Sequence, residues 1–164
     1  DLEIINENTK KFSHNLIILC GGNDSLKFSK KKADIVRNRL DDYVIRNCIK
    51  KKIKFIGICW GAIKINEHFN GVTKKIPNHV KKFHEINGFI KIKNKRVKKK
   101  VVVNSYHNFH PKKLGKNLIE CMKCKKDNST EMFFHNKKKI FGIMWHPERN
   151  KRISNFDKII FKNL

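Results

Sequence analysis

The most constraining stretch of this chain runs from residue 53 to residue 69. An apolar segment of β type, 53–58, leads into Gly57-Ile58-Cys59-Trp60-Gly61, and a helix-compatible run, 62–69, follows at once. This order of strand, sharp turn and helix is that of a nucleophile elbow, with cysteine where hydrolases carry serine. The two glycines permit a tight turn and a close approach of strand to helix.

Cys59 supports two interpretations. A cysteine at a helix N-terminus lies in a partial positive charge that favours the thiolate, so the elbow predicts an accessible nucleophile with a lowered pKa. The alternative is a buried structural thiol after a core strand, because free cysteines are often buried. The pentapeptide alone favours neither interpretation, and the other motifs of the chain decide between them.

Length and cysteine usage restrict the class of protein. The 164 residues suit a single domain spanning 1–164. No apolar stretch approaches the roughly 18 residues that span a bilayer, and no signal-peptide pattern opens the sequence. Five unevenly spaced cysteines argue against a disulfide scaffold. We therefore expect a cytoplasmic protein without a membrane partner.

The net charge of +25 raises the question of nucleic-acid binding. The lysines, however, occur as short runs at the ends of apolar segments, and no basic stripe interleaved with aromatic residues accompanies them. We interpret them as solvated caps of strands and helices and expect no specific nucleic-acid partner. The field they create would attract an anionic substrate.

The remaining pattern is typical of an open α/β sheet. A continuous apolar run, 16–20, ends at Gly21-Gly22, as expected for a strand buried on both faces. Buried strands then alternate with helices, and polar motifs follow the strand ends, which places a site at that edge of the sheet. We expect helices at 33–50 and 156–161, and further strands at 2–5, 88–92, 101–103, 118–123, 131–135 and 139–145.

Two polar motifs at strand ends complement the cysteine. A nucleophilic thiol needs a base, and the base needs an acceptor that orients it. His146 can accept the proton of Cys59, and Glu148 lies on the same side of an extended chain and can hold the imidazole. The Gly21-Gly22 turn offers exposed N–H groups that can hold an anion.

Four motifs in this order resemble the class I glutamine amidotransferase family, and most closely its γ-glutamyl hydrolase (peptidase C26) branch. They are Gly-Gly-Asn-Asp at 21–24, Gly-Ile-Cys-Trp-Gly at 57–61, Val-Asn-Ser-Tyr-His at 103–107 and Gly-Ile-Met-Trp-His-Pro-Glu at 142–148. The resemblance implies a flavodoxin-like, three-layer open sheet, mostly parallel, with helices on both faces. The family's first strand and helix have no counterpart here, so we expect an N-terminally truncated domain.

The resemblance also implies a role for each motif. Cys59 would be the nucleophile, His146 the general base and acid, and Glu148 the residue that orients His146. The N–H groups of Gly22 and Trp60 would form the oxyanion hole. The residues expected to bind substrate are Gly21, Asn104, Ser105, Tyr106 and His107. Ile63 stands where the family usually carries a glutamine that touches the substrate.

The sequence predicts no metal ion and no cofactor. Cys121 and Cys124 resemble half of a zinc or redox site, but no second pair exists. The spacing of His79, His84 and His107 matches no zinc motif, so we expect these histidines on the surface or in the lining of the site.

The predicted function is cleavage of a γ-glutamyl amide through a γ-glutamyl-thioester on cysteine, with release of glutamate. Within the branch, the motifs resemble members that hydrolyse a γ-glutamyl nucleotide phosphoramidate in surface-polysaccharide modification. Two alternatives stay open. One is a glutaminase subunit that donates ammonia to a synthase partner, and the other is a non-catalytic, basic nucleic-acid-binding protein.

Overall fold

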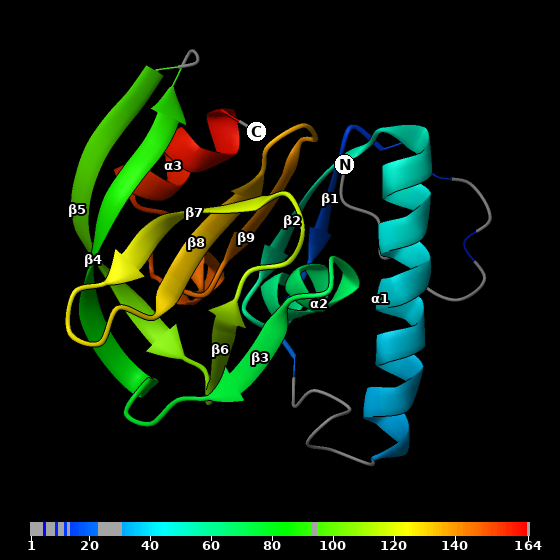
Figure 1. Ribbon diagram of the computed structural model, residues 1–164, viewed down its shortest axis with the longest axis horizontal. Coiled ribbons are helices and arrows are strands. Elements are labelled where there is room, and N and C mark those ends of the chain that lie inside the picture. The colour runs from blue at the N-terminus through cyan, green and yellow to red at the C-terminus, as the bar shows by residue number, and fades with distance from the viewer. Residues whose placement is uncertain are drawn as a thin grey trace.

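The computed structural model describes residues 5, 9, 12, 14–22, 31–92 and 95–163. In this part, a seven-stranded sheet has the order β1-β2-β9-β8-β7-β4-β5, and β3 pairs with β6 in a second, two-stranded sheet (Figure 1). The strands are β1 (Leu16–Leu19), β2 (Lys54–Ile58), β3 (Val72–Lys75), β4 (Val80–Ile92), β5 (Lys95–Tyr106), β6 (Phe109–Lys113), β7 (Leu118–Cys124), β8 (Thr130–His135) and β9 (Ile140–Ile143). The helices are α1 (Lys32–Lys51), α2 (Trp60–His68) and α3 (Asn155–Lys162), with a 3₁₀ turn, η1 (Pro147–Arg149).

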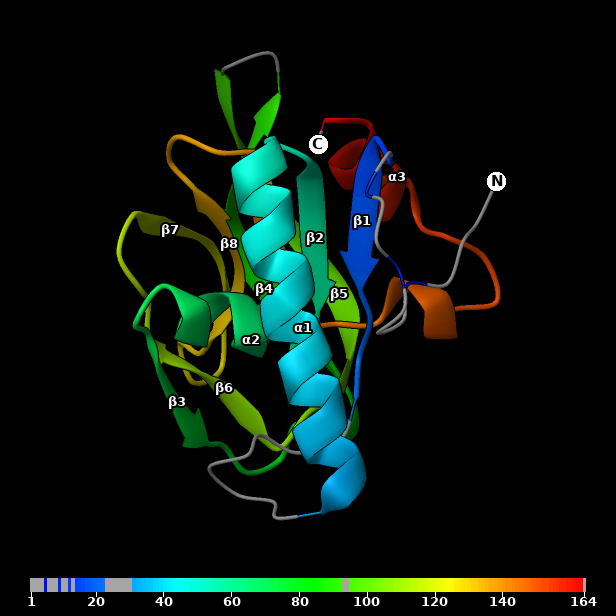
Figure 2. The same cartoon turned by 90° about the vertical axis from the view of Figure 1, so that its right-hand side faces the viewer.

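Helices cover both faces of the large sheet. Helices α1 and α2 lie together over one face, and α3 packs on the other (Figures 1 and 2). Alternate side chains of β2 enter the two layers: Phe55 belongs to the cluster with α1 and α2, and Ile56 to the cluster with α3. Both are fully buried, which stabilises the fold by about 1.5–3 kcal/mol for each side chain. The predicted three-layer open α/β sheet is confirmed.

The parallel part of the sheet positions the chemistry. Strand β2 runs parallel to β1 on one side and to β9 on the other. Gly21, Cys59 and His146 follow the carboxyl ends of these three strands, so they meet at one edge of the sheet. The other strands of the sheet pair antiparallel, from β9 through to β5.

The antiparallel part is larger than the sequence predicted. We expected strands only at 88–92 and 101–103, but β4 and β5 form a hairpin of 13 and 12 residues at the left of Figure 1. The hairpin carries many lysines and exposes even apolar side chains such as Phe83 (71%) and Val102 (65%). The alternation of apolar and polar residues that identifies a strand is therefore hard to recognise in its sequence. Strands β3 and β6 were not predicted: β6 contains Pro111, and a proline within a run argues against a strand.

Helix α3 is tied to the segment that carries His146. Its N-cap residue, Ser154, accepts a hydrogen bond from the N–H of Asp157 at 3.0 Å. The indole N–H of Trp145 donates to Oδ1 of Asp157 at 2.8 Å. The residue before His146 is therefore held by the helix that follows it.

Two expectations concern the N-terminal strand and membrane-spanning helices. The strand expected at 2–5 lies outside the described residues, except for Ile5. Among the described strands, β1 pairs with β2 alone and leaves Ile18 40% exposed, so β1 is the edge on that side. No helix among the described residues combines the length and apolarity needed to cross a membrane.

Candidate active site

Cys59 forms the turn between β2 and α2. Its backbone has φ 51° and ψ −103°, a conformation that non-glycine residues rarely adopt and that costs on the order of 1–3 kcal/mol. The N–H of Cys59 donates to the carbonyl of Ile143 at 2.7 Å, and the N–H of Ile63 donates to the carbonyl of Cys59 at 3.0 Å. Strand β9 and the first turn of α2 thus hold the strained residue, as in a nucleophile elbow.

The two positions that flank the turn, Gly57 and Gly61, have no room for a side chain. A Cβ on Gly57 would lie 2.3 Å from the carbonyl carbon of Gly61, and a Cβ on Gly61 would lie 2.2 Å from the carbonyl oxygen of Leu19. These atoms are backbone atoms, so they cannot rotate out of the way. The prediction that these glycines let strand and helix approach closely is confirmed.

His146 and Glu148 form a hydrogen-bonded pair. Nδ1 of His146 lies 2.6 Å from Oε1 of Glu148, and the carboxylate accepts the hydrogen on that nitrogen. Burial alone would raise the pKa of Glu148, but the bond from His146 and the positive charge of Arg149 bring it below its usual value. The other ring nitrogen, Nε2, is buried and has no hydrogen-bond partner among the described residues, so it is available to a substrate or a thiol.

Cys59 and His146 meet across Gly21. A Cβ placed on Gly21 would lie 2.8 Å from Cε1 of His146 and 3.9 Å from Cβ of Cys59. The imidazole and the thiol-bearing carbon therefore flank the same small residue, and a side chain there would push the imidazole away. The structure thus brings together the predicted nucleophile, base and orienting residue.

The predicted state of Cys59 is wrong in one respect. The residue is only 6% exposed, and burial raises the pKa of its thiol to about 12. The N–H of Trp60 and the charge of Arg149 act in the opposite direction but do not outweigh the loss of solvation. The thiol is therefore protonated at rest, and its proton has to leave as the sulfur attacks.

The two residues predicted for the oxyanion hole are neighbours beside Cys59. Gly22 and Trp60 line the same cavity as Cys59, and a Cβ on Gly22 would lie 3.3 Å from the ring of Trp60. The indole N–H of Trp60 donates to Oδ2 of Asp41 in α1 at 2.7 Å, which fixes the ring. Their role in binding an oxyanion stays a prediction.

Asn104 faces the protein backbone. Its side-chain NH₂ donates to the carbonyl of His146 at 2.8 Å, and its side-chain oxygen accepts from the N–H of His146 at 2.8 Å. The same NH₂ also lies 3.0 Å from Oδ1 of Asn150. This buried amide is committed to positioning His146, which leaves it little capacity for a substrate.

Ser105 is fully buried, and its hydroxyl donates to the carbonyl of His79 at 2.6 Å. It too contacts the protein and not the cavity. Tyr106 lies edge-on to the ring of His146, with centroids 5.7 Å apart, and the guanidinium of Arg149 stacks on the ring of Tyr106, 4.2 Å from its centroid. Of the predicted substrate-binding residues, Tyr106 and His107 line the cavity beside Cys59.

This cavity has a volume of about 320 Å³ and opens beside the nucleophile. It is lined by Gly22, Lys31, Asp34, Cys59, Trp60, Ile63, Tyr106, His107, Asn108 and Phe109. A larger cavity of about 420 Å³ lies between α3 and the amino end of β9, away from Cys59. The smaller cavity is the candidate substrate site because it contains the reactive sulfur.

A second group of polar side chains was not predicted. Glu131 in β8 is completely buried, and the rings of His79, His84 and His107 surround its carboxylate. Of these three histidines, only His107 lines the cavity as expected, while His79 is buried and does not line it. A signal was present in the sequence, since an ionisable residue directly before Met132-Phe133-Phe134 needs a buried partner.

Comparison with known proteins places these features in a family. The family model described as glutamine amidotransferase class-I matches residues 2–163. A protein from Campylobacter jejuni named gamma-glutamyl-CDP-amidate hydrolase is 40% identical over 140 residues, which are 85% of this chain. The chain spans 64% of the length of that relative.

Solved structures share the fold at low sequence identity. A GMP synthase subunit from Thermoplasma acidophilum superposes with a TM-score of 0.71 at 17% identity, over 92% of this chain and 71% of the other. A glutamine amidotransferase from Thermotoga maritima gives a TM-score of 0.66 at 17% identity, over 82% of this chain and 56% of the other. At these identities the likeness concerns the fold.

Proposed function

This chain belongs to the class I glutamine amidotransferase family, and from that premise we propose that it is a cysteine-dependent hydrolase of a γ-glutamyl amide bond. The observation that carries the proposal is the meeting of Cys59, on its strained turn, with the His146–Glu148 pair across Gly21. A thiol, a base with a free nitrogen and an orienting carboxylate are the groups that acyl transfer through a thioester requires.

The first half of the reaction forms the thioester. The sulfur of Cys59 attacks the γ-carbonyl carbon of the substrate while its proton moves to Nε2 of His146. The carboxylate of Glu148 stabilises the resulting imidazolium through Nδ1. The N–H groups of Trp60 and Gly22 donate to the oxyanion. His146 then returns the proton to the leaving nitrogen as the carbon–nitrogen bond breaks.

The second half releases glutamate. Water attacks the thioester carbon and gives a proton to Nε2 of His146, which passes it to the departing sulfur of Cys59. The high pKa of the buried thiol fits this cycle, because a neutral sulfur is the better leaving species and proton transfer is coupled to each attack. Every proton that moves in the two halves passes through His146.

The cavity suits a γ-glutamyl head. Its volume of about 320 Å³ is at the lower end of the range for small-molecule sites. Asp34 and Lys31 in its lining carry charges opposite to those of an α-ammonium and an α-carboxylate. Ile63 adds an apolar contact in the same lining.

For the leaving group we favour a nucleotide phosphoramidate. The relative from Campylobacter jejuni carries the name gamma-glutamyl-CDP-amidate hydrolase, and the present chain has a net charge of +25 that would attract a phosphorylated substrate. Arg149, which stacks on Tyr106 beside the cavity, is a cation in position to contact a phosphate.

Intact-protein mass spectrometry tests the chemistry. The protein is incubated with a glutamine-analogue electrophile and, separately, with a panel of γ-glutamyl compounds from which glutamate release is measured. We expect one adduct on Cys59 and no turnover in Cys59→Ser, whereas the control Cys121→Ser, which alters a buried thiol in β7, keeps both. An adduct on another cysteine, or glutamate release that persists in Cys59→Ser, would refute the proposal.

The same panel separates the substrates. We expect kcat/KM for a γ-glutamyl nucleotide phosphoramidate to fall with added salt, while that for a neutral γ-glutamyl amide barely changes, because steering acts over a Debye length of about 10 Å at 0.1 M salt. Equal salt slopes would remove the charge argument. If glutamine were the single substrate turned over, and only in the presence of an added synthase, the amidotransferase alternative would be established instead.

A further inference from the structure

Beside the active site, a buried carboxylate is surrounded by three imidazoles, two from around the start of β4 and one that follows β5. His79 precedes β4, His84 lies in β4, His107 follows β5, and Glu131 lies in β8. Oε1 of Glu131 is 3.6 Å from Nδ1 of His79 and 3.6 Å from Nε2 of His107, and Oε2 is 3.3 Å from Nε2 of His84. Glu131 is 0% exposed, and His79 and His107 are each 3% exposed. A carboxylate this deeply buried needs a compensating positive charge.

The hydrogen on His79 can be located from its other contacts. Nε2 lies 2.8 Å from Oδ2 of Asp127, a carboxylate that accepts only, so Nε2 carries the hydrogen. In the neutral ring Nδ1 then has a lone pair, which faces Glu131. Oγ of Ser105 also lies 3.4 Å from Nδ1, but the single hydroxyl hydrogen of Ser105 goes to the carbonyl of His79 at 2.6 Å.

The hydrogen on His107 follows in the same way. Its Nδ1 lies 2.9 Å from the carbonyl oxygen of Phe109, which can only accept, so Nδ1 carries the hydrogen. The lone pair on Nε2 faces Oε1 of Glu131. Neither Nε2 of His107 nor Oε2 of Glu131 has a hydrogen-bond partner among the described residues.

Three electron pairs thus converge on one buried point, where the hydroxyl of Ser129 also donates to Oε1 of Glu131 at 3.4 Å. A cation bound between the three groups would supply the positive charge that the carboxylate needs. A proton on either ring would draw nitrogen and oxygen to about 2.7–2.9 Å, which is the length of a charge-assisted hydrogen bond. The observed separations are 3.6 Å. Ligands of one tetrahedral ion with bonds of about 2.0–2.1 Å lie about 3.3–3.4 Å apart, which is closer to what is observed.

We propose that Nδ1 of His79, Nε2 of His107 and the carboxylate of Glu131 bind a divalent first-row transition metal ion, with Zn²⁺ as the probe. The three ligand atoms lie within 4.8 Å of one another. Asp127 and the Phe109 carbonyl hold the second nitrogens of the two rings, which is how proteins orient metal-binding histidines. Two histidines and a glutamate form a known ligand set for zinc.

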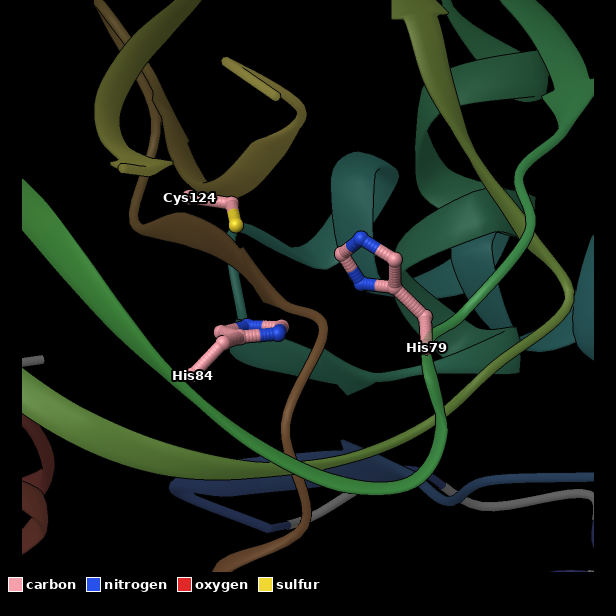
Figure 3. Close-up of side chains that lie close together, drawn as sticks. All are labelled: His79, His84 and Cys124. Atoms are coloured by element: carbon pink, nitrogen blue, oxygen red, sulfur yellow. The ribbon is translucent and has the colours of Figure 1, made fainter. Parts of the chain in front are cut away.

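A neighbouring set of side chains competes for the same ion. His79, His84 and Cys124 also have ligand atoms within 4.8 Å of one another, and Figure 3 shows the three side chains pointing into one space. We place the ion at Glu131, because there the negative charge is fully buried and the second nitrogens of both rings are held. His84, 3.3 Å from the other carboxylate oxygen, is available as a fourth ligand.

Such an ion would join the segments that form one wall of the substrate cavity. His107 both contacts Glu131 and lines the cavity, and Phe109, whose carbonyl fixes His107, lines it too. The metal would therefore fix the part of the wall that His107 and Phe109 form and take no part in the proton transfers of Cys59 and His146. The site is independent of the proposed hydrolase activity.

Metal titration tests the inference without an activity assay. The chelator-treated chain is titrated with Zn²⁺ by calorimetry, and with Co²⁺ while its visible absorption is recorded. We expect one equivalent per chain and a Co²⁺ spectrum without a thiolate-to-metal charge-transfer band. His79→Gln and Glu131→Gln should each weaken binding by more than about 100-fold, since even the loss of a group that only orients a ligand costs up to that factor.

Two matched controls should keep the affinity of the wild type: Cys124→Ser, which removes the competing ligand, and His68→Gln, which removes a histidine on α2. Circular dichroism checks that each variant folds. If Glu131→Gln does not fold, the wild-type Co²⁺ spectrum still tests the proposed ligand set. No stoichiometric binding, a thiolate charge-transfer band, loss of binding in Cys124→Ser, or wild-type affinity in folded His79→Gln would each overturn the inference.

Discussion

Asn104→Ala would remove the side-chain hydrogen bonds that hold the backbone of His146. The Asn104 side chain makes two hydrogen bonds of 2.8 Å, one to the N–H and one to the carbonyl of His146. Asn104 is 2% exposed and His146 is 3% exposed, so water cannot replace the lost partner without a rearrangement. The substitution leaves the buried N–H of His146 unpaired, whereas the carbonyl of His146 keeps a hydrogen bond from the N–H of Arg149 at 3.2 Å.

The expected cost follows from the one group that loses its partner. A buried polar group left without a partner costs about 1–3 kcal/mol, so we expect the free energy of unfolding to fall by about that amount. Activity should fall mainly in kcat with KM nearly unchanged, because a displaced imidazole weakens the transition state and leaves substrate contacts in place.

Urea unfolding at constant m-value measures the stability, and steady-state kinetics measures the activity. Asn136→Ala, at an exposed turn, is the matched control and should change the stability by less than about 0.5 kcal/mol. A loss below about 0.5 kcal/mol in Asn104→Ala, or an effect confined to KM, would refute the positioning role and restore Asn104 as a substrate contact.

Three further substitutions or treatments test the site. Iodoacetamide at neutral pH should label the exposed Cys20 first and Cys59 slowly, because burial raises the pKa of the Cys59 thiol. Peptide mass spectrometry that finds Cys59 labelled first would contradict this. Gly61→Ala should lower the free energy of unfolding by about 3 kcal/mol or more in thermal and urea unfolding, because its Cβ would lie 2.2 Å from a backbone oxygen. Gly22→Ala, whose Cβ would have its nearest contact at 3.3 Å, should fold. Equal stability of the two variants would contradict the elbow argument. Glu148→Gln should lower kcat. Because the pKa of Glu148 is lowered in the folded state, this carboxylate stabilises the wild type above the usual carboxyl pKa of about 4.3, and the stabilisation disappears as the pH falls through the pKa of the folded state. A difference in stability between wild type and variant that grows in acid would contradict the assigned sign.

The local features of the fold could be predicted from the sequence. Helix α1 spans Lys32–Lys51 where the periodicity indicated 33–50, and the elbow follows from glycine spacing within five residues. These features depend on neighbours in the chain, so pattern and propensity are enough to find them. The meeting of Cys59 with His146 was inferred from chemistry, since 87 residues separate them.

Features that depend on tertiary contacts were missed. The burial that raises the pKa of Cys59 comes from surrounding segments, whereas the helix N-terminus that suggested a low pKa is local. His79 directly precedes β4, His84 lies in β4, His107 follows β5, and Glu131 lies in β8. No spacing in the sequence reveals that these residues converge. Much of hairpin β4–β5 is exposed to solvent, so lysines replace the apolar residues whose alternation would have indicated a strand.

The alternation of side chains along the end of β5 restricts how this protein can vary in length. Asn104 and Tyr106 contact His146, while the intervening Ser105, together with His107, contacts the histidines around Glu131. Inserting or deleting one residue just before Asn104 would exchange the two sets and disable both sites in a single event. Tolerated insertions therefore belong at the far end of the hairpin, beyond Ile92 and before Lys95, where the strand pairing can lengthen without changing which face each of these four side chains occupies.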